Sequence, residues 1–152
     1  MSGVRASGGS FFTTMRKYYS LTPHTADIAM VVEADSLENI YFNSARALAD
    51  ILVGIDNVSE SIKREMTIKA VDRDDLLIRF LNELIYVFSV DKVIFSDFNI
   101  IKLNDRELIC MAKGDRIGAL NRIKSEIKAA TYCDFKIEEN RGSYKAKVIL
   151  DV

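Results

Sequence analysis

The chain of 152 residues contains a single histidine, His24, and a single proline, Pro23. A Ser-His-Asp or Cys-His catalytic arrangement would therefore have to use His24. The sequence has no nucleophile-elbow motif and no glycine-rich phosphate loop, and its glycines at 54 and 142 are placed as a helix stop and a turn residue. These absences argue against an independent covalent catalyst, and a lone histidine in a loop is more often structural.

Cysteine is nearly as scarce, and no apolar run reaches the roughly 20 residues that a membrane-spanning helix needs. The two cysteines, Cys110 and Cys133, have neither a metal-ligand spacing nor the pattern of a disulfide framework. We expect both to be buried, reduced thiols. This indicates a cytoplasmic protein without a membrane segment.

The charge balance limits the choice of partners. With 21 Lys and Arg against 22 Asp and Glu, the net charge of −1 argues against a surface that attracts nucleic acid as a whole, and we expect no sequence-specific binding of it. Basic residues do gather in two segments: Arg116, Arg122, Lys124 and Lys128, then Lys136, Arg141, Lys145 and Lys147. Such residues usually form a solvated face, and contact with a phosphate backbone is the alternative.

Length and composition are those of an ordinary globular protein of one domain. Residues 1–14 are rich in Ser, Gly and Thr and lack the apolar segment of a secretory signal. We expect them to form a disordered leader, and residues 15–152 to form a single domain.

Hydrophobic periodicity predicts two long helices among several strands. One helix is expected from a cap at Asp35 or Ser36 to Gly54, and a second begins at the acidic segment 71–75. Alternation predicts strands over residues 16–21, 27–33, 62–70, 93–103, 106–113, 133–138 and 144–150, and a short helix is expected within 116–128. This order predicts an α+β fold, a two-layer sandwich in which two main helices pack on a mixed, largely antiparallel sheet.

The only proline and histidine share a short segment, residues 21–27, that ends with Asp27 at the start of a predicted strand. Proline fixes φ and biases the residue before it toward extended geometry, so the segment should be stiff. A stiff loop that brings the His24 imidazole and the Asp27 carboxylate to a strand is a candidate site. The plainer interpretation makes Asp27 a turn residue.

Carboxylates are the ligands that hard cations prefer. Candidate ligands are Asp27, the cluster Asp72, Asp74 and Asp75, and Asp151. Alternation places Asp151 opposite the apolar face of the last strand. From the pattern alone, the plainer interpretation is favoured: the cluster caps a helix, and Asp151 is a solvated chain end.

Three parts of the sequence resemble the archease family, in the family's order and spacing. They are HTADI at 24–28, DLLIRFLNELIY at 75–86, and IKAATY at 127–132 with VILDV at 148–152. Each motif is weak by itself, and together they are specific. The resemblance covers essentially everything after Met15.

The resemblance implies a small cytoplasmic protein with a two-layer α/β fold that assists the RtcB-type RNA ligase of tRNA splicing. It implies that the protein promotes guanylylation of the ligase's active-site histidine and multiple turnover. A divalent metal, calcium, would be held by Asp27 and Asp151, with a main-chain oxygen of Val152 as a further ligand. Supporting roles are expected for His24, Asp75, Lys128 and Tyr132.

The chain departs from the family pattern at two positions. Ala29 stands where glycine often follows the Asp-Ile pair, and Cys133 stands where many members carry histidine, so the role of that histidine is not carried over. With His24 alone, a His-rich metal site is excluded.

Two other functions stay open. A chaperone-like binding module for RNA-processing enzymes, such as a tRNA cytosine methyltransferase, should depend much less on Asp27. An independent metal hydrolase would predict activity in the isolated protein, and the chain lacks a second histidine or a nucleophile for it.

Overall fold

The computed structural model describes residues 18–24, 27–118, 123–133 and 135–152, with the backbone alone for 22–24. The predicted leader, residues 1–14, lies outside this part and stays a prediction. No helix in the described part is long and apolar enough to cross a membrane. In chain order the elements are β1 (Tyr19–His24), β2 (Asp27–Ala34), α2 (Leu37–Val53), a 3-10 turn η2 (Ile55–Asn57), β3 (Ile62–Lys69), α3 (Arg73–Asp91), β4 (Val93–Leu103), β5 (Glu107–Arg116), β6 (Ala129–Thr131), β7 (Ile137–Asn140) and β8 (Ser143–Asp151).

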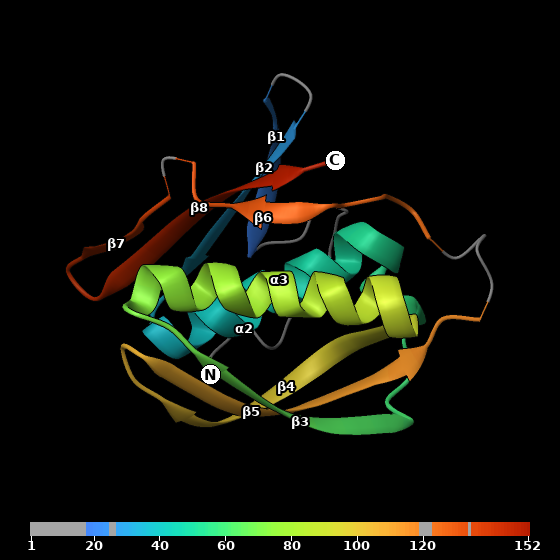
Figure 1. Ribbon diagram of the computed structural model, residues 1–152. Coiled ribbons are helices and arrows are strands. Elements are labelled where there is room, and N and C mark those ends of the chain that lie inside the picture. The colour runs from blue at the N-terminus through green and yellow to red at the C-terminus, as the bar shows by residue number, and fades with distance from the viewer. Residues whose placement is uncertain (1–17, 25–26, 119–122, 134) are drawn as a thin grey trace.

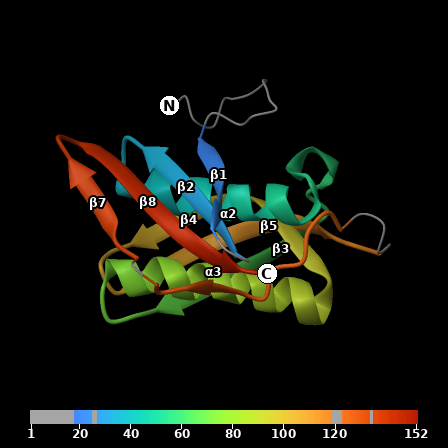
Figure 2. The same cartoon turned by 90° about the horizontal axis from the view of Figure 1, so that it is seen from above.

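Two antiparallel sheets lie on either side of the two long helices (Figure 1). The first sheet has the strand order β1-β2-β8-β6, with β7 also paired to β8, and the second has the order β3-β5-β4. Viewed from above, β2 and β8 run side by side across the molecule (Figure 2). The predicted α+β fold, with two main helices packed on antiparallel sheet, is confirmed. The strands divide into two sheets, one on each side of the helices, rather than forming the one mixed sheet of a two-layer sandwich.

Both helices begin where the sequence predicts, and α2 also ends there. Ser36 caps α2 by accepting a hydrogen bond from the Asn39 N–H at 3.1 Å, and Gly54, at φ 82°, ends this helix. Asp72 caps α3 by accepting a hydrogen bond from the Asp75 N–H at 2.8 Å. Local side-chain chemistry therefore sets the starts of both helices.

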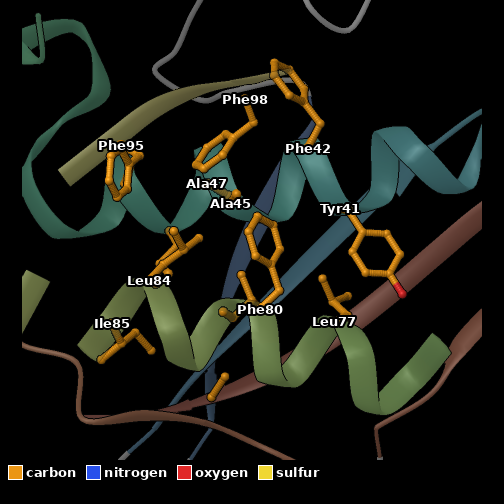
Figure 3. Packing of buried hydrophobic residues seen from close by; sticks show 14 of the residues in the cluster. Tyr41, Phe42, Ala45, Ala47, Leu77, Phe80, Leu84, Ile85, Phe95 and Phe98 are labelled. Atoms are coloured by element: carbon orange, nitrogen blue, oxygen red, sulfur yellow. The ribbon is translucent and has the colours of Figure 1, made fainter. Parts of the chain in front are cut away.

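Aromatic side chains join the two helices to β4 (Figure 3). Phe80 of α3 meets Phe98 of β4 edge to face, with 5.7 Å between ring centroids, and Phe42 of α2 lies 6.5 Å from the Phe98 ring. The buried Tyr41 donates its hydroxyl to the Arg73 carbonyl at 2.6 Å, which satisfies its one polar group. One continuous core holds the helices against both sheets.

A close approach between β4 and β5 requires a glycine. A Cβ on Gly114 would lie 1.9 Å from the Ile94 carbonyl oxygen and 2.7 Å from the Phe95 Cα. The register of the two strands shifts here, between Phe95 and Asp97. No other residue type fits at this position without moving the backbone of β4.

The helix predicted within residues 116–128 is wrong for the described part of that range. Arg116 ends β5, and residues 117–118 and 123–128 are not helical, whereas 119–122 lie outside the described residues. Ile117 and Ile127 are buried, so their helix-like spacing reflects two separate anchors to the core. The Ile117 N–H donates to the Lys92 carbonyl at 2.7 Å, which fixes the start of this irregular segment.

The strands near the C-terminus also differ from the prediction. Residues 129–131 form β6, which is too short to show a period of two, and the strand predicted from residue 133 begins only at Ile137. Cys133 precedes that strand and is exposed, so the prediction of a buried thiol is wrong for Cys133. It is confirmed for Cys110, where burial raises the pKa of the thiol to about 11.

Candidate metal site

Asp27 and Asp151 lie at the same end of two neighbouring antiparallel strands. Asp27 is the first residue of β2, and Asp151 is the last of β8. The register pairs Ile28 with Leu150, and one further step places Asp27 across from Asp151. On its other side, Asp151 pairs with Ala129 of β6. The strand pairing thus brings together two acids that are far apart in the sequence.

The two carboxylates lie on the sheet face that points away from the helices. Side chains alternate along a strand, and Ile28 and Leu150 pack against the core, so Asp27 and Asp151 face the opposite way. Both aspartates are half-buried, and Ile149, the neighbour of Asp151 on this face, is 5% exposed. Asp151 therefore lies beside the buried side chain of Ile149 rather than in a solvated run of charges.

The predicted metal ligands among these residues are the two carboxylates of Asp27 and Asp151. Among the described residues, neither has a hydrogen-bond or ion-pair partner, and no group of three or more His, Cys, Asp or Glu side chains could hold a metal ion. Like charges on facing positions of neighbouring strands destabilise the pair. A hard cation would relieve this repulsion, taking Asp27, Asp151 and the main-chain oxygen of Val152 as ligands and completing its shell with water or a bound molecule.

His24 is connected to this site through the backbone. It ends β1 and pairs with Asp27, the first residue of β2. Residues 25–26 and the side chain of His24 lie outside what the structure describes. The supporting role of His24 therefore stays a prediction.

The carboxylate of Asp75 accepts three hydrogen bonds from other residues of the chain. Its Oδ1 accepts from the Tyr132 hydroxyl at 2.6 Å, and its Oδ2 accepts from the Arg79 Nε at 2.8 Å and the Val71 N–H at 3.1 Å. The hydrogen bond from Tyr132 is the main cause that holds the pKa of Asp75 below its usual value. The pKa of Tyr132 is raised, first by burial and then by this same bond. This carboxylate links α3 to the segment after β6.

The rest of the acidic cluster also serves the fold. Asp72 caps α3, and the Oδ1 of Asp74 accepts a hydrogen bond from the Ile137 N–H at 3.0 Å, at the start of β7. The structure thus favours the plainer interpretation of this cluster, in which its acids cap the helix and tie neighbouring segments to it.

Two further contacts connect the segment around β6 to Asp151 and to α3. Lys128 has an exposed side chain, and its N–H donates to the Asp151 carbonyl at 2.8 Å. Asn82 bonds both main-chain groups of Ala130, as donor at 3.0 Å and as acceptor at 2.8 Å. Sequence reasoning missed Asn82. Its position seven residues after Asp75, on the same side of the helix, does not reveal its partner.

The basic residues of β8 stand among acids. Lys145 pairs with Glu33 of β2 on one side and with Glu138 of β7 on the other. All three residues are exposed. Alternating charges across neighbouring strands stabilise a solvated sheet face, and this favours the solvated-face interpretation of that segment.

Comparison with known families matches residues 19–152 to the Archease protein family. The chain belongs to the archease family. The protein archease of Methanosarcina mazei is 30% identical over 141 residues, which cover 90% of this chain and 97% of that relative. The protein archease of Pyrococcus abyssi is 33% identical over 135 residues, which cover 85% of this chain and 94% of that relative.

Two solved structures share the archease architecture described above. The solution structure of Methanobacterium thermoautotrophicum protein 1598 has a TM-score of 0.76 and 28% identity, and the match covers 88% of this chain and 98% of that one. The crystal structure of an archease from Thermotoga maritima, described as a possible chaperone, has a TM-score of 0.62 and 25% identity, with 91% and 98% covered.

Proposed function

We propose that this protein activates an RtcB-type tRNA-splicing RNA ligase in the cytoplasm, by promoting guanylylation of the ligase and its multiple turnover. Membership of the archease family gives the class of function. The observation that supports the site is the pairing of Ile28 with Leu150, which puts the next residues, Asp27 and Asp151, at the same end of the first sheet.

A divalent cation, calcium, fits this donor set. Hard cations take carboxylate and carbonyl oxygens, and Asp27, Asp151 and the main-chain oxygen of Val152 supply three of the six to eight that calcium takes. Because Val152 is 40% exposed, the remaining positions are open to ligands from outside the chain. When bound, the cation would orient triphosphate oxygens and offset the charge that develops on a leaving pyrophosphate.

The residues of this chain supply position rather than reaction chemistry. Strands β2 and β8 hold the two carboxylates at a sheet end, next to the covered Ile149. The only histidine of the sequence ends β1 and pairs with Asp27, and the sequence has no nucleophile-elbow motif. We therefore place the chemical step in the ligase, with this protein completing the surroundings of its nucleotide.

Formation of the ligase–GMP adduct tests the proposal. The ligase of the same host is mixed with GTP, calcium and this protein, or with its Asp27→Asn or Asp151→Asn variant. We expect each variant to slow adduct formation at least about tenfold, because loss of one ligand weakens the binding of the ion and positions it less accurately. Asp105→Asn, an exposed acid of the β4–β5 hairpin, is the matched control and should activate normally. Full activation by both site variants in their folded state would rule out the metal site.

A chaperone-like binding module for RNA-processing enzymes, such as a tRNA cytosine methyltransferase, is the second candidate. It is favoured by the description of the Thermotoga maritima protein as a possible chaperone. In that case the methyltransferase should bind wild-type protein, Asp27→Asn and Asp151→Asn equally well in a direct binding measurement. A requirement for Asp27 in ligase activation, without one in methyltransferase binding, would separate the two functions.

A further inference from the structure

Asn82 of α3 takes the place of a neighbouring strand beside β6. Its Nδ2 donates to the Ala130 carbonyl at 3.0 Å, and its Oδ1 accepts from the Ala130 N–H at 2.8 Å. An adjacent β-strand would offer one residue the same donor and acceptor. Because Ala130 is 3% exposed, its main-chain groups depend on this amide rather than on solvent.

Strand β6 has few other bonds to hold it. It consists of three residues and pairs with β8 alone among the described strands. Ala130 pairs with Leu150, Ala129 pairs with Asp151, and the Lys128 N–H donates to the Asp151 carbonyl at 2.8 Å. The last residues of a strand open at low free energy unless neighbouring segments hold them. The position of Asp151 thus depends on β6, and that of β6 on Asn82.

We infer that Asn82 is a positioning residue for the metal site. It fixes the main chain of Ala130, β6 in turn fixes the main chain of Asp151, and this sets where the Asp151 carboxylate faces Asp27. The inference rests on the proposed function in that it takes Asp151 as a metal ligand. Groups that hold the ligands of a metal, without touching it, typically change its affinity by about 10- to 100-fold when they are removed.

Binding of the metal alone tests this role. Calcium affinity is measured by calorimetry on the full chain, and terbium luminescence lifetimes in H₂O and D₂O count the water molecules on the bound ion. We expect Asn82→Ala to weaken calcium binding about tenfold and to raise the water count on terbium, because the Asp151 carboxylate no longer holds its place. A merely less stable protein that remains folded would not change the water count.

A second variant and a control complete the test. Asn82→Asp keeps the acceptor for the Ala130 N–H but sets a carboxylate oxygen against the Ala130 carbonyl in place of the donor, so it should show an effect of the same sign. Asn104 accepts a hydrogen bond from the Arg106 N–H at 2.9 Å in the turn between β4 and β5, and Asn104→Ala should leave calcium binding and water count unchanged.

The failures of the two proposals are distinguishable. Wild-type affinity and water count in both Asn82 variants, while Asp151→Asn abolishes binding, would overturn the positioning role alone. A wild-type protein that binds neither calcium nor terbium would overturn the proposed metal site and this inference with it.

Discussion

Tyr132, which follows β6, donates a hydrogen bond of 2.6 Å to Asp75, in the first turn of α3 and 57 residues earlier in the chain. The tyrosine ring is largely exposed, while the Asp75 side chain is 12% exposed. Two segments that the sequence marks as family motifs are thus joined directly. The bond ties the segment after β6 to the start of α3.

This bond predicts a stability that depends on pH. The pKa of Asp75 is lowered in the folded protein, first by Tyr132, so its contribution is present above the unfolded value of about 3.9 and is lost as the pH falls through the lower folded value. Tyr132→Phe should cost about 1 kcal/mol at pH 7 and lose less stability than wild type on acidification below pH 4. Denaturant unfolding at pH 7 and pH 3 measures both effects. An equal difference between the two proteins at both pH values would contradict the assignment.

Replacing either site aspartate should change the stability of the protein in opposite directions without and with calcium. Without metal, Asp27→Asn or Asp151→Asn removes the repulsion across β2 and β8 and should stabilise the protein by roughly 0.2–1 kcal/mol. With calcium, the same variants should be less stable than wild type because they bind the ion weakly. Thermal unfolding in chelator and in excess calcium measures the reversal. Asp105→Asn should show none.

Calcium should stabilise the wild-type protein by mass action. At a free concentration 100 times the dissociation constant, binding to the native state alone contributes about 2.7 kcal/mol. A chelator should reverse the increase in melting temperature, and Asp151→Asn should show little increase at the same concentration. Identical melting curves for wild type with and without saturating calcium would argue against a native-state site.

Gly114→Ala should destabilise the second sheet. The added Cβ would lie 1.9 Å from the Ile94 carbonyl oxygen, so the backbone of β4 must move. We expect a loss of at least about 1–3 kcal/mol in the free energy of unfolding, as for overpacked positions. Gly118→Ala is the matched control, because a Cβ there meets nothing within 4 Å. Similar stability of both variants would mean that β4 adjusts easily.

The two cysteines should react differently with a thiol reagent. Cys133 is exposed, whereas Cys110 is buried and has a pKa raised to about 11, so its thiol stays protonated near pH 8. One thiol should react in the native protein and two after unfolding. Cys133→Ser should leave no fast-reacting thiol. Two fast thiols in the native state would show that β5 opens readily.

Local chemistry made the two helices predictable. Ser36 and Asp72 accept hydrogen bonds from N–H groups three residues later, which is a pattern that the sequence displays. Residues 117–128 misled the prediction because buried Ile117 and Ile127 imitate a helical stripe while anchoring separate points. Periodicity gives the faces of a strand but not its partners, so it could not divide the strands between two sheets.

The candidate site was predictable to a different extent. The resemblance named Asp27 and Asp151, and only the pairing of β2 with β8 brings them together. Asn82 could not be assigned from the sequence because its partner, Ala130, lies 48 residues away in a strand of three residues. Contacts of one side chain with a distant main chain leave no periodic signal.

The amide of Asn82 also bears on association between molecules. An outermost strand with unpaired main-chain groups is a template on which another chain can add a strand, the first step of many aggregates. At Ala130 both groups are already bonded within the molecule, so β6 offers no free pair there to a second copy. The helix thereby blocks, at this residue of β6, the growth of the sheet into a larger β-structure.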